Sequence, residues 1–273
     1  MSPLTPFIRW VGSKRRLAPH ITPHIPNGLR LVEPFAGSGA VTLAKQPEKA
    51  WINDANSELM NLWQVIAAGD IDDFVERVHT HAERMNREYW ITLRDMEHNT
   101  SLMRSLTNLD RAARYITIIS NAYGGKESRN TKGRLTSSYG GAKGAWKAKK
   151  LRKYCTDIRA YLDANNVTLT NLDYTAVLDA VKPGDVVYID PPYEVRTRRD
   201  YYAEVWKLGA LEMLYSYCEN LTRKGIPVIV SNDTSEAVRS CFKEWTVTTF
   251  TIDYMGSLNK NQKESLFTNY NLI

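Results

Sequence analysis

Residues 190–193 of this 273-residue chain read Asp-Pro-Pro-Tyr, and an apolar run of β-branched and aromatic side chains at 186–189 precedes them. Such a run predicts a buried strand, and the two prolines end it. The tetrapeptide should therefore lie at the carboxyl end of a strand, which is where open α/β sheets bind their ligands.

The chemistry that this tetrapeptide suits is narrow. An exocyclic amino group on a nucleobase is a poor nucleophile because its lone pair is delocalised into the ring, and two acceptors aimed at its N–H bonds would favour a pyramidal nitrogen. Asp190 can supply a carboxylate oxygen and Pro191 its main-chain carbonyl, while Pro192 stiffens the backbone around them. Tyr193 offers a flat face for a base taken out of its stack. The alternative is a strand terminator with an unrelated acid, so the interpretation depends on partners elsewhere.

A glycine turn at residues 33–39, Glu-Pro-Phe-Ala-Gly-Ser-Gly, lies between a predicted short strand and a predicted helix. Strand, turn and helix form the first unit of a nucleotide-binding sheet, in which Gly37 and Gly39 allow close approach of a ligand. A dinucleotide fingerprint would need glycine at position 42, where this chain has Thr42. Glu33 also suits the ammonium group of an amino-acid-bearing cofactor, whereas it would repel a pyrophosphate.

Two further segments could contact the same cofactor. A short predicted strand at 50–54 ends in Asp54, which is placed to accept hydrogen bonds from ribose hydroxyls. Near the start of the chain, Trp10 and Lys14 flank a Gly-Ser turn. This loop could cover a cofactor and reach its carboxylate with Lys14, or it could be a loop that Trp10 anchors in the core.

The alternation of strands and helices stops between residues 70 and 150, where apolar residues recur at helical spacing. This pattern predicts a helical lobe with a basic loop, inserted into a sheet domain. Further strands are expected at 167–173, 185–189 and 227–232, and an antiparallel hairpin at the sheet edge from 245–252 and 265–272.

Positive charge is concentrated in one stretch. Residues 126–153 hold ten Lys/Arg and one acid, Glu127, which gives +9, and because the whole chain is +6 the remainder is −3. A basic segment on a mildly acidic body indicates an element that faces a polyanion. The alternative is a solvated loop without a partner.

Composition excludes several classes of protein. No apolar run of 18 residues occurs, and the N-terminal residues lack a signal-peptide pattern. Cys155, Cys218 and Cys241 are far apart and match neither a metal site nor a disulfide framework. We therefore expect a cytoplasmic protein without a membrane segment or a metal.

Together the motifs form a set. Phe-x-x-Trp-x-Gly-x-Lys at 7–14, Glu-Pro-Phe-x-Gly-x-Gly at 33–39, an Asn-Asp strand end and Asp-Pro-Pro-Tyr at 190–193 follow one another in the chain. This set resembles the Dam-type DNA adenine-N6 methyltransferases of bacterial or phage type. The resemblance implies an α/β fold, a Rossmann-like class I methyltransferase sheet with helices on both faces. It also implies a catalytic domain at 1–58 and 151–273 and an inserted helical target-recognition lobe at 59–150.

The resemblance implies three groups of site residues. The cofactor group is Trp10, Lys14, Glu33, Phe35, Gly37, Gly39, Asp54, Asp173 and Asp190. The catalytic group is Asp190, Pro191, Pro192 and Tyr193. The DNA-binding group is Arg9, Asn121, Tyr123, Arg129 and Asn130, to which the basic stretch adds Lys147 and Lys149. The chain departs from the family at residues 138–140, where Ser-Tyr-Gly stands in place of Pro-Phe-Gly.

The implied reaction is methyl transfer from S-adenosyl-L-methionine to N6 of a flipped adenine in double-stranded DNA, with GATC as a candidate site. The implied protein is a monomer or weak dimer, and restriction-modification is one candidate role. Cytosine-N4 methyltransferases usually carry serine at the position of Asp190, and RNA-adenine methyltransferases tend to carry asparagine there. These two enzymes and a catalytically silent DNA-binding module remain the alternatives, while Thr42 disfavours a nicotinamide dehydrogenase.

Overall fold

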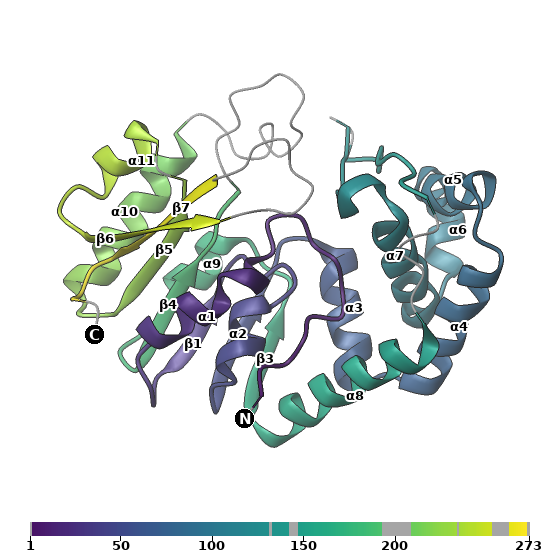
Figure 1. Cartoon of the computed structure of the whole chain (residues 1–273), viewed down its shortest axis with the longest axis horizontal. Helices are drawn as coiled ribbons and strands as arrows, with labels where there is room; N and C mark the ends of the chain where they lie inside the picture. The colour runs from purple at the N-terminus through teal and green to yellow at the C-terminus, as the bar shows by residue number, and fades with distance from the viewer. Residues whose placement is uncertain are drawn as a thin grey trace.

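Seven strands make one mixed sheet in the part of the chain that the computed structural model describes, residues 2–130, 133–141, 147–192, 209–233, 235–252 and 262–271 (Figure 1). The strands are β1 (Arg30–Glu33), β2 (Lys49–Asn53), β3 (Asn166–Thr170), β4 (Asp185–Ile189), β5 (Val228–Asn232), β6 (Thr246–Ile252) and β7 (Gln262–Thr268). The α-helices are α1 (Ala18–Ile21), α2 (Ala40–Lys45), α3 (Ser57–Ala68), α4 (Ile71–Glu83), α5 (Arg87–Asp95), α6 (Thr100–Ser105), α7 (Asn108–Asn121), α8 (Ala148–Ala164), α9 (Tyr174–Asp179), α10 (Ala210–Arg223) and α11 (Glu236–Cys241). Short 3-10 helices are η1 (Lys14–Arg16), η2 (Thr22–His24), η3 (Met96–His98) and η4 (Tyr123–Gly125).

The strand order is β3-β2-β1-β4-β5-β7-β6, and only the pairings that involve β7 are antiparallel. Val32 at the centre of β1 pairs with Trp51 of β2 on one side and Val187 of β4 on the other. The chain runs outward from β1 to β3 and then returns to β4, so the strand order reverses between β1 and β4. Ligands of open α/β sheets bind at the carboxyl ends of the strands beside such a reversal.

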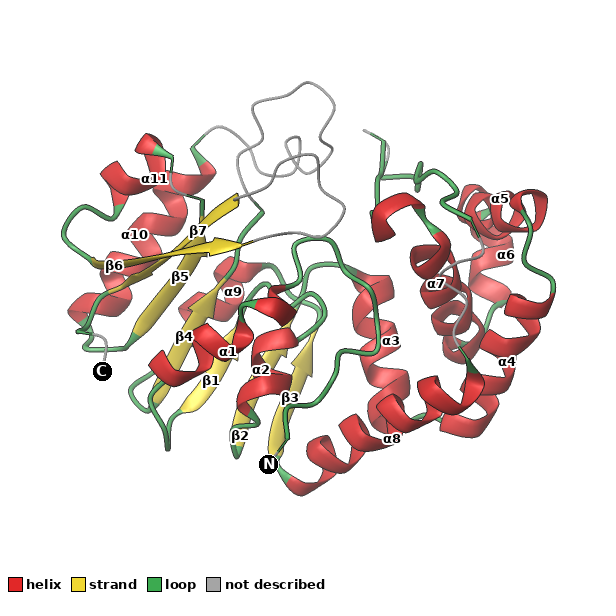
Figure 2. Cartoon of the chain, in the orientation of Figure 1, coloured by secondary structure: helices red, strands yellow, loops and turns green. Residues whose placement is uncertain are grey.

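Apolar side chains alternate between the two faces of the central strands, which is why these strands are apolar runs in the sequence. Leu31 and Val186 pack in the core cluster that contains residues of α1 and α2. Val32 and Val187 pack in the cluster that contains residues of α9, α10 and α11. Helices therefore cover both faces, as Figure 2 shows, and the predicted sheet is confirmed.

The helical lobe enters between β2 and β3, as the sequence predicts. Helices α3 and α8 connect it to the sheet, because α3 packs on β3, α7 and α8 while α8 packs on β3 and α4 (Figure 1). One apolar cluster runs from Ile52 of β2 through Trp63 of α3 to Trp90 of α5 and Ile116 of α7. The predicted domain limits, after residues 58 and 150, fall in the first turns of α3 and α8, and the shared core joins the two parts there.

The starts of the lobe helices are set by side-chain caps. Asn56, Asp70, Asn86 and Asn99 each accept hydrogen bonds from backbone N–H groups in the first turn of α3, α4, α5 and α6. Thr107 forms a reciprocal capping box at the start of α7. Within the described residues, no helix has the length and apolar character that crossing a membrane requires.

Candidate active site

The candidate catalytic carboxylate, Asp190, follows the last residue of β4 and is 20% exposed. Its Oδ1 lies 2.7 Å from Nζ of Lys14, a lysine in η1 that is only 5% exposed. These two residues are 176 positions apart in the chain. Pro191 is buried and Pro192 is half-buried, whereas the predicted base-stacking residue Tyr193 lies outside the described residues.

Two buried polar residues that the sequence reasoning missed support this ion pair. Nζ of Lys14 also lies 3.4 Å from Oε1 of Glu264 on β7, and this oxygen accepts a hydrogen bond of 2.6 Å from Ser231 on β5. A serine and a glutamate inside buried strands were the available signal, because buried polar groups normally have partners. Lys14 therefore holds two carboxylates, one of them in the catalytic motif.

Glu33 lies in the core at the end of β1 and is 2% exposed. Its Oε1 accepts a hydrogen bond of 2.6 Å from the backbone N–H of Thr42 and a second bond from the hydroxyl group of the same residue. Burial raises the pKa of the Glu33 carboxyl to about 7, against the hydrogen bonds from Thr42, and the charge of Asp190 adds to the rise. A buried carboxyl with this pKa can bind an ammonium group and take up or release a proton near neutral pH.

The glycine turn is fixed by two indole rings. The ring of Trp10 lies directly on Gly37, since a Cβ atom at this glycine would come within 2.7 Å of Nε1 of Trp10. A Cβ at Gly39, which has φ +64°, would come within 2.5 Å of the Trp63 ring. Core anchoring of the N-terminal loop comes from Phe7, which is fully buried, while Trp10 is half-buried. Trp10 thus covers the turn, and both glycines are required.

Asp54 follows β2 and connects the glycine turn to the lobe. Its Oδ2 accepts the backbone N–H of Gly37 at 2.9 Å, and its Oδ1 accepts the backbone N–H of Asn56 at 2.9 Å. Burial raises the pKa of the Asp54 carboxyl to about 6, while these two amides lower it and the charge of Glu127 adds to the rise. The residue predicted to bind ribose therefore also orders the turn.

The predicted third strand, 167–173, ends earlier than expected, at Thr170. The cause is Asn53, which is fully buried. Its side chain donates to the carbonyls of Pro34 and Leu172 at 3.0 Å and accepts the backbone N–H of Leu172 at 2.9 Å. These bonds turn the chain away from the sheet after β3.

Asp173 is consequently a helix cap and not a strand residue. Its Oδ1 accepts the backbone N–H of Thr175 at 3.0 Å at the start of α9, and its side chain is exposed. Next to it, the ring of Tyr174 lies 4.9 Å from that of Phe35, which belongs to the glycine turn, and Leu172 is 42% exposed. An apolar and aromatic surface beside an exposed acid can bind a heterocycle such as adenine.

The predicted DNA-reading segment forms an irregular hairpin after α7. Bridges join Ala122 to Tyr139 and Arg129 to Leu135 in antiparallel pairs. At its start, Tyr123 is 76% exposed, so a large ring projects from the lobe. Arg9 of the N-terminal loop lies on this hairpin, because a Cβ at Gly125 would come within 2.9 Å of the Arg9 side chain.

The other predicted hairpin residues face inward. Asn121 is 2% exposed and donates to the Thr117 carbonyl at 2.9 Å, so in this conformation it supports the hairpin from beneath. Asn130 accepts the backbone N–H of Arg134 at 3.0 Å and shapes the turn. Arg129 is 29% exposed and forms ion pairs with two glutamates, one inside the hairpin segment and one in the preceding helices.

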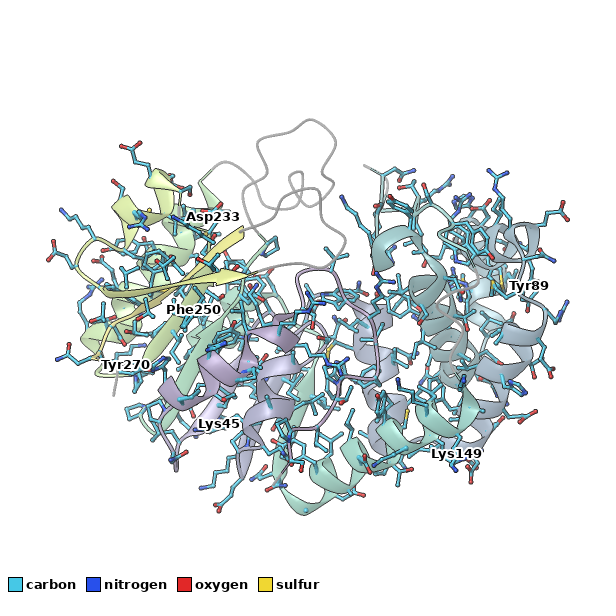
Figure 3. All side chains as sticks on the ribbon, in the orientation of Figure 1. Lys45, Tyr89, Lys149, Asp233, Phe250 and Tyr270 are labelled. Carbon is cyan, nitrogen blue, oxygen red and sulfur yellow. The ribbon has the colours of Figure 1, made fainter. Side chains whose placement is uncertain are left out.

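Lys147 and Lys149 are not brought to this group. They are exposed at the start of α8, and Figure 3 shows Lys149 at the lower end of the lobe, whereas the carboxyl ends of the parallel strands point to the upper edge. The first turn of α8 contains no acid. Lysines at this end of a helix add to the positive end of its dipole and suit a phosphate partner.

The structure thus gathers Lys14, Glu33, Asp54 and Asp190 at the carboxyl ends of β1, β2 and β4, with the Phe35 ring beside them. The carboxylates can bind an ammonium group and ribose hydroxyls, and the aromatic surface can bind a base. The acceptors of the Asp-Pro-Pro segment can receive an amino group.

Comparison with known proteins agrees with this arrangement. The sequence model of the D12 class N6 adenine-specific DNA methyltransferases matches residues 10–258. The chain is similar to the type II methyltransferase M1.LlaDCHI of Lactococcus lactis subsp. cremoris, with 28% identity over 89% of this chain and 86% of the relative. It is 30% identical to the retron Ec67 DNA adenine methylase of Escherichia coli, over 89% of this chain and 82% of the relative. With the DNA adenine methylase of Serratia marcescens it shares 27% identity over 87% and 86% of the two chains. The chain belongs to the D12 class of N6 adenine-specific DNA methyltransferases.

Proposed function

We propose that this methyltransferase takes its methyl group from S-adenosylmethionine and transfers it to an adenine flipped out of duplex DNA. The observation that carries the proposal is the position of Asp190, which lies at the end of β4 with its carboxylate held by Lys14 beside the glycine turn. When bound, S-adenosylmethionine supplies an electrophilic methyl group. No other cofactor is needed for this chemistry.

The donor set at the strand ends supports this cofactor. Glu33 carries the charge that binds the ammonium group of the methionine part, and the exposed surface around Phe35 suits the adenine ring. Asp54 has acceptor oxygens for ribose hydroxyls. Lys14 already holds Asp190 and Glu264, so we propose that it shares its charge with the methionine carboxylate while it keeps Asp190 oriented.

The residues of the chain act on the target amino group by position and charge. Asp190 and the carbonyl of Pro191 accept the two N6–H bonds, which localises the lone pair on N6. The ion pair with Lys14 fixes the direction of the carboxylate. Asp190 need not remove a proton before methylation, because N6 becomes acidic only afterwards. Tyr193 is proposed to stack on the flipped base.

The hairpin is proposed to hold and read the duplex. Tyr123, at 76% exposed, fills the space that the flipped adenine leaves. Arg9 and Arg129 contact base edges, while Lys147 and Lys149 contact phosphates further along the duplex. GATC is the first sequence to test. Cys155, Cys218 and Cys241 are free thiols, which supports a reducing, cytoplasmic setting.

The test is to incubate the protein with S-adenosylmethionine labelled in the methyl group and with duplexes that contain or lack GATC, and then to identify the labelled nucleoside. We expect N6-methyldeoxyadenosine. Asp190→Ala should reduce turnover on the order of 10²–10³-fold because one of two preorganised acceptors is lost. Asp179→Ala, which removes an exposed carboxylate of α9, is the control.

Other outcomes identify the alternatives. Label in N4-methyldeoxycytidine or only in RNA would replace the proposal with the corresponding enzyme. Binding of DNA without any label would leave a silent binding module. Near-normal turnover of Asp190→Ala would show that the Asp-Pro-Pro-Tyr motif is not the catalytic element.

A further inference from the structure

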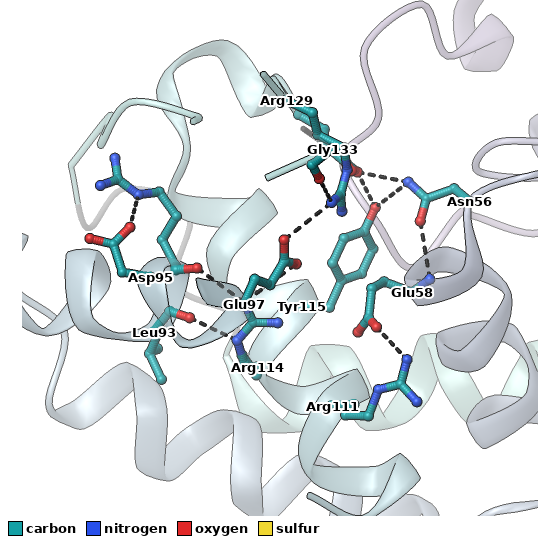
Figure 4. A network of polar contacts seen from close by, with 12 residues as sticks. Asn56, Glu58, Leu93, Asp95, Glu97, Arg111, Arg114, Tyr115, Arg129 and Gly133 are labelled. Atoms are coloured by element: carbon teal, nitrogen blue, oxygen red, sulfur yellow. Dashed lines mark hydrogen bonds and ion pairs between the residues drawn. The ribbon is translucent and has the colours of Figure 1, made fainter. Parts of the chain in front are cut away.

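Glu127 is the only acid in the basic stretch, and the proposed function gives it no role. Its side chain is buried, and its Oε1 accepts a hydrogen bond of 2.5 Å from Nε of Arg129. Its Oε2 accepts bonds from the hydroxyl of Tyr115 on α7 and from Nδ2 of Asn56, the latter at 2.9 Å (Figure 4). Each oxygen of this carboxylate thus has a different task.

Arg129 is held from a second direction as well. Its Nη1 donates to Oε2 of Glu97 at 3.1 Å and to the carbonyl of Gly133 at 2.8 Å. Glu97 in turn lies 3.4 Å from Arg114, which is 1% exposed. None of the described residues accepts a hydrogen bond from Nη2 of Arg129, so this amino group can donate to a base edge while the rest of the guanidinium is fixed.

The contacts of Glu127 continue to the cofactor turn. Asn56 binds Glu127 with its side chain and Asp54 with its backbone N–H, and Asp54 accepts the backbone N–H of Gly37. An unbroken series of hydrogen bonds therefore runs from Gly37 to Arg129. The charge of Glu127 also contributes to the raised pKa of Asp54, which indicates that the two carboxylates influence each other.

We propose that Glu127 is a positioning residue for site discrimination: it fixes Arg129 and, through Asn56, links the position of this arginine to occupancy of the cofactor site at Asp54. The inference rests on the proposed function, because it takes Arg129 to contact a base and Asp54 to contact the cofactor. The physical reason is burial. If Arg129 moved away, Glu127 would remain as a buried charge without its counter-ion, which is strongly unfavourable. Cofactor binding and base contact must then favour the same arrangement of this network.

Two measurements test the link. One is discrimination, the ratio of kcat/KM on the methylated site to kcat/KM on a single-base variant. The other is cofactor coupling, the ratio of the Kd for S-adenosylmethionine without target duplex to the Kd with it. Glu127→Gln keeps the size of the side chain and an acceptor oxygen but removes the charge. We expect discrimination to fall about tenfold and cofactor coupling to approach one.

Two comparison variants separate positioning from general packing. Glu97→Gln also weakens the hold on Arg129, but Glu97 lies outside the series of hydrogen bonds that leads to Asp54, so this variant should lower discrimination and keep cofactor coupling. Asn56→Ser retains a good helix cap for α3 but cannot reach Glu127, so it should lose cofactor coupling. Glu83→Gln, on an exposed glutamate of α4, should change neither ratio.

A double variant shows whether Glu127 acts through the arginine. Glu127→Gln combined with Arg129→Ala should discriminate no worse than Arg129→Ala alone. The inference is overturned if Glu127→Gln, shown to be folded by its melting curve, keeps both wild-type ratios. It is also overturned if Arg129→Ala keeps full discrimination, or if the wild-type cofactor coupling is one. Adenine methylation itself is assayed separately, so these results leave the proposed function intact.

Discussion

Glu33→Gln should make the protein more stable at pH 8 and weaken its binding of cofactor. The side chain is 2% exposed, and the glutamine keeps an oxygen that can accept the Thr42 amide. Burial raises the pKa of Glu33 from 4.5 to about 7, so the folded state binds the proton more tightly than the unfolded state does. This contribution to stability is complete below pH 4.5 and is lost as the pH rises through 7. At 1.36 kcal/mol per pKa unit it amounts to about 3 kcal/mol, which the uncharged glutamine should recover in part at pH 8.

The cofactor should respond to pH in the opposite direction. An ammonium group favours the ionised form of Glu33, so binding of S-adenosylmethionine releases a proton below pH 7. The Kd of the wild type should therefore fall up to about tenfold per pH unit as the pH rises towards 7 and then level off. Glu33→Gln should bind about 10- to 100-fold more weakly at pH 8, since a hydrogen bond to a charged group is lost. Its Kd should show little of this slope.

The assay is calorimetric titration of S-adenosylmethionine at several pH values, with denaturant unfolding of both proteins at pH 5 and pH 8. Asp54, whose pKa burial raises to about 6, adds its own pH dependence to both proteins and cancels in the difference. Glu48→Gln, at an exposed carboxylate before β2, is the control. The reasoning is refuted if the wild-type affinity does not change between pH 5 and pH 8, or if Glu33→Gln keeps the wild-type slope.

The same geometry leads to three further predictions. Lys14→Met leaves the carboxylates of Glu264 and the Asp-Pro-Pro segment without their cation, so denaturation should show a loss of about 3–5 kcal/mol, which Glu264→Gln partly restores; unchanged stability would contradict the pairing. Tyr123→Ala should change stability by no more than about 0.5 kcal/mol, because the ring is 76% exposed, yet it should reduce base flipping measured with a fluorescent adenine analogue. Lys147→Ala with Lys149→Ala should lower the salt slope of binding by about one unit for each phosphate that no longer meets a lysine, on a long duplex only; an equal change on a short duplex centred on the target would place the lysines at the hairpin.

The sheet could be predicted because its central strands are buried on both faces, so each is a short apolar run next to a turn signal. The inserted lobe could be predicted because helical spacing replaces that pattern between β2 and β3. The limit of the third strand could not be predicted, since it is set by hydrogen bonds from Asn53 to the chain 119 residues later. The pairing of Lys14 with Asp190, over 176 residues, depends likewise on the completed sheet. Spacing within a motif indicates chemistry, but it does not indicate which distant side chain will hold the reacting group.

The basic stretch shows a second limit of sequence reasoning. A count of +9 treats each Lys and Arg as available to DNA, whereas Arg129 is already paired with Glu127 inside the stretch and with Glu97 outside it. Burial with these carboxylates turns the arginine from a diffuse attractor of phosphates into a fixed donor with one amino group available. Such a residue can contribute little to nonspecific affinity and much to the choice of site, since its orientation is set before the duplex arrives. Nonspecific attraction near the hairpin must then come from exposed cations such as Arg9, which is why a change at Glu127 should alter discrimination more than affinity.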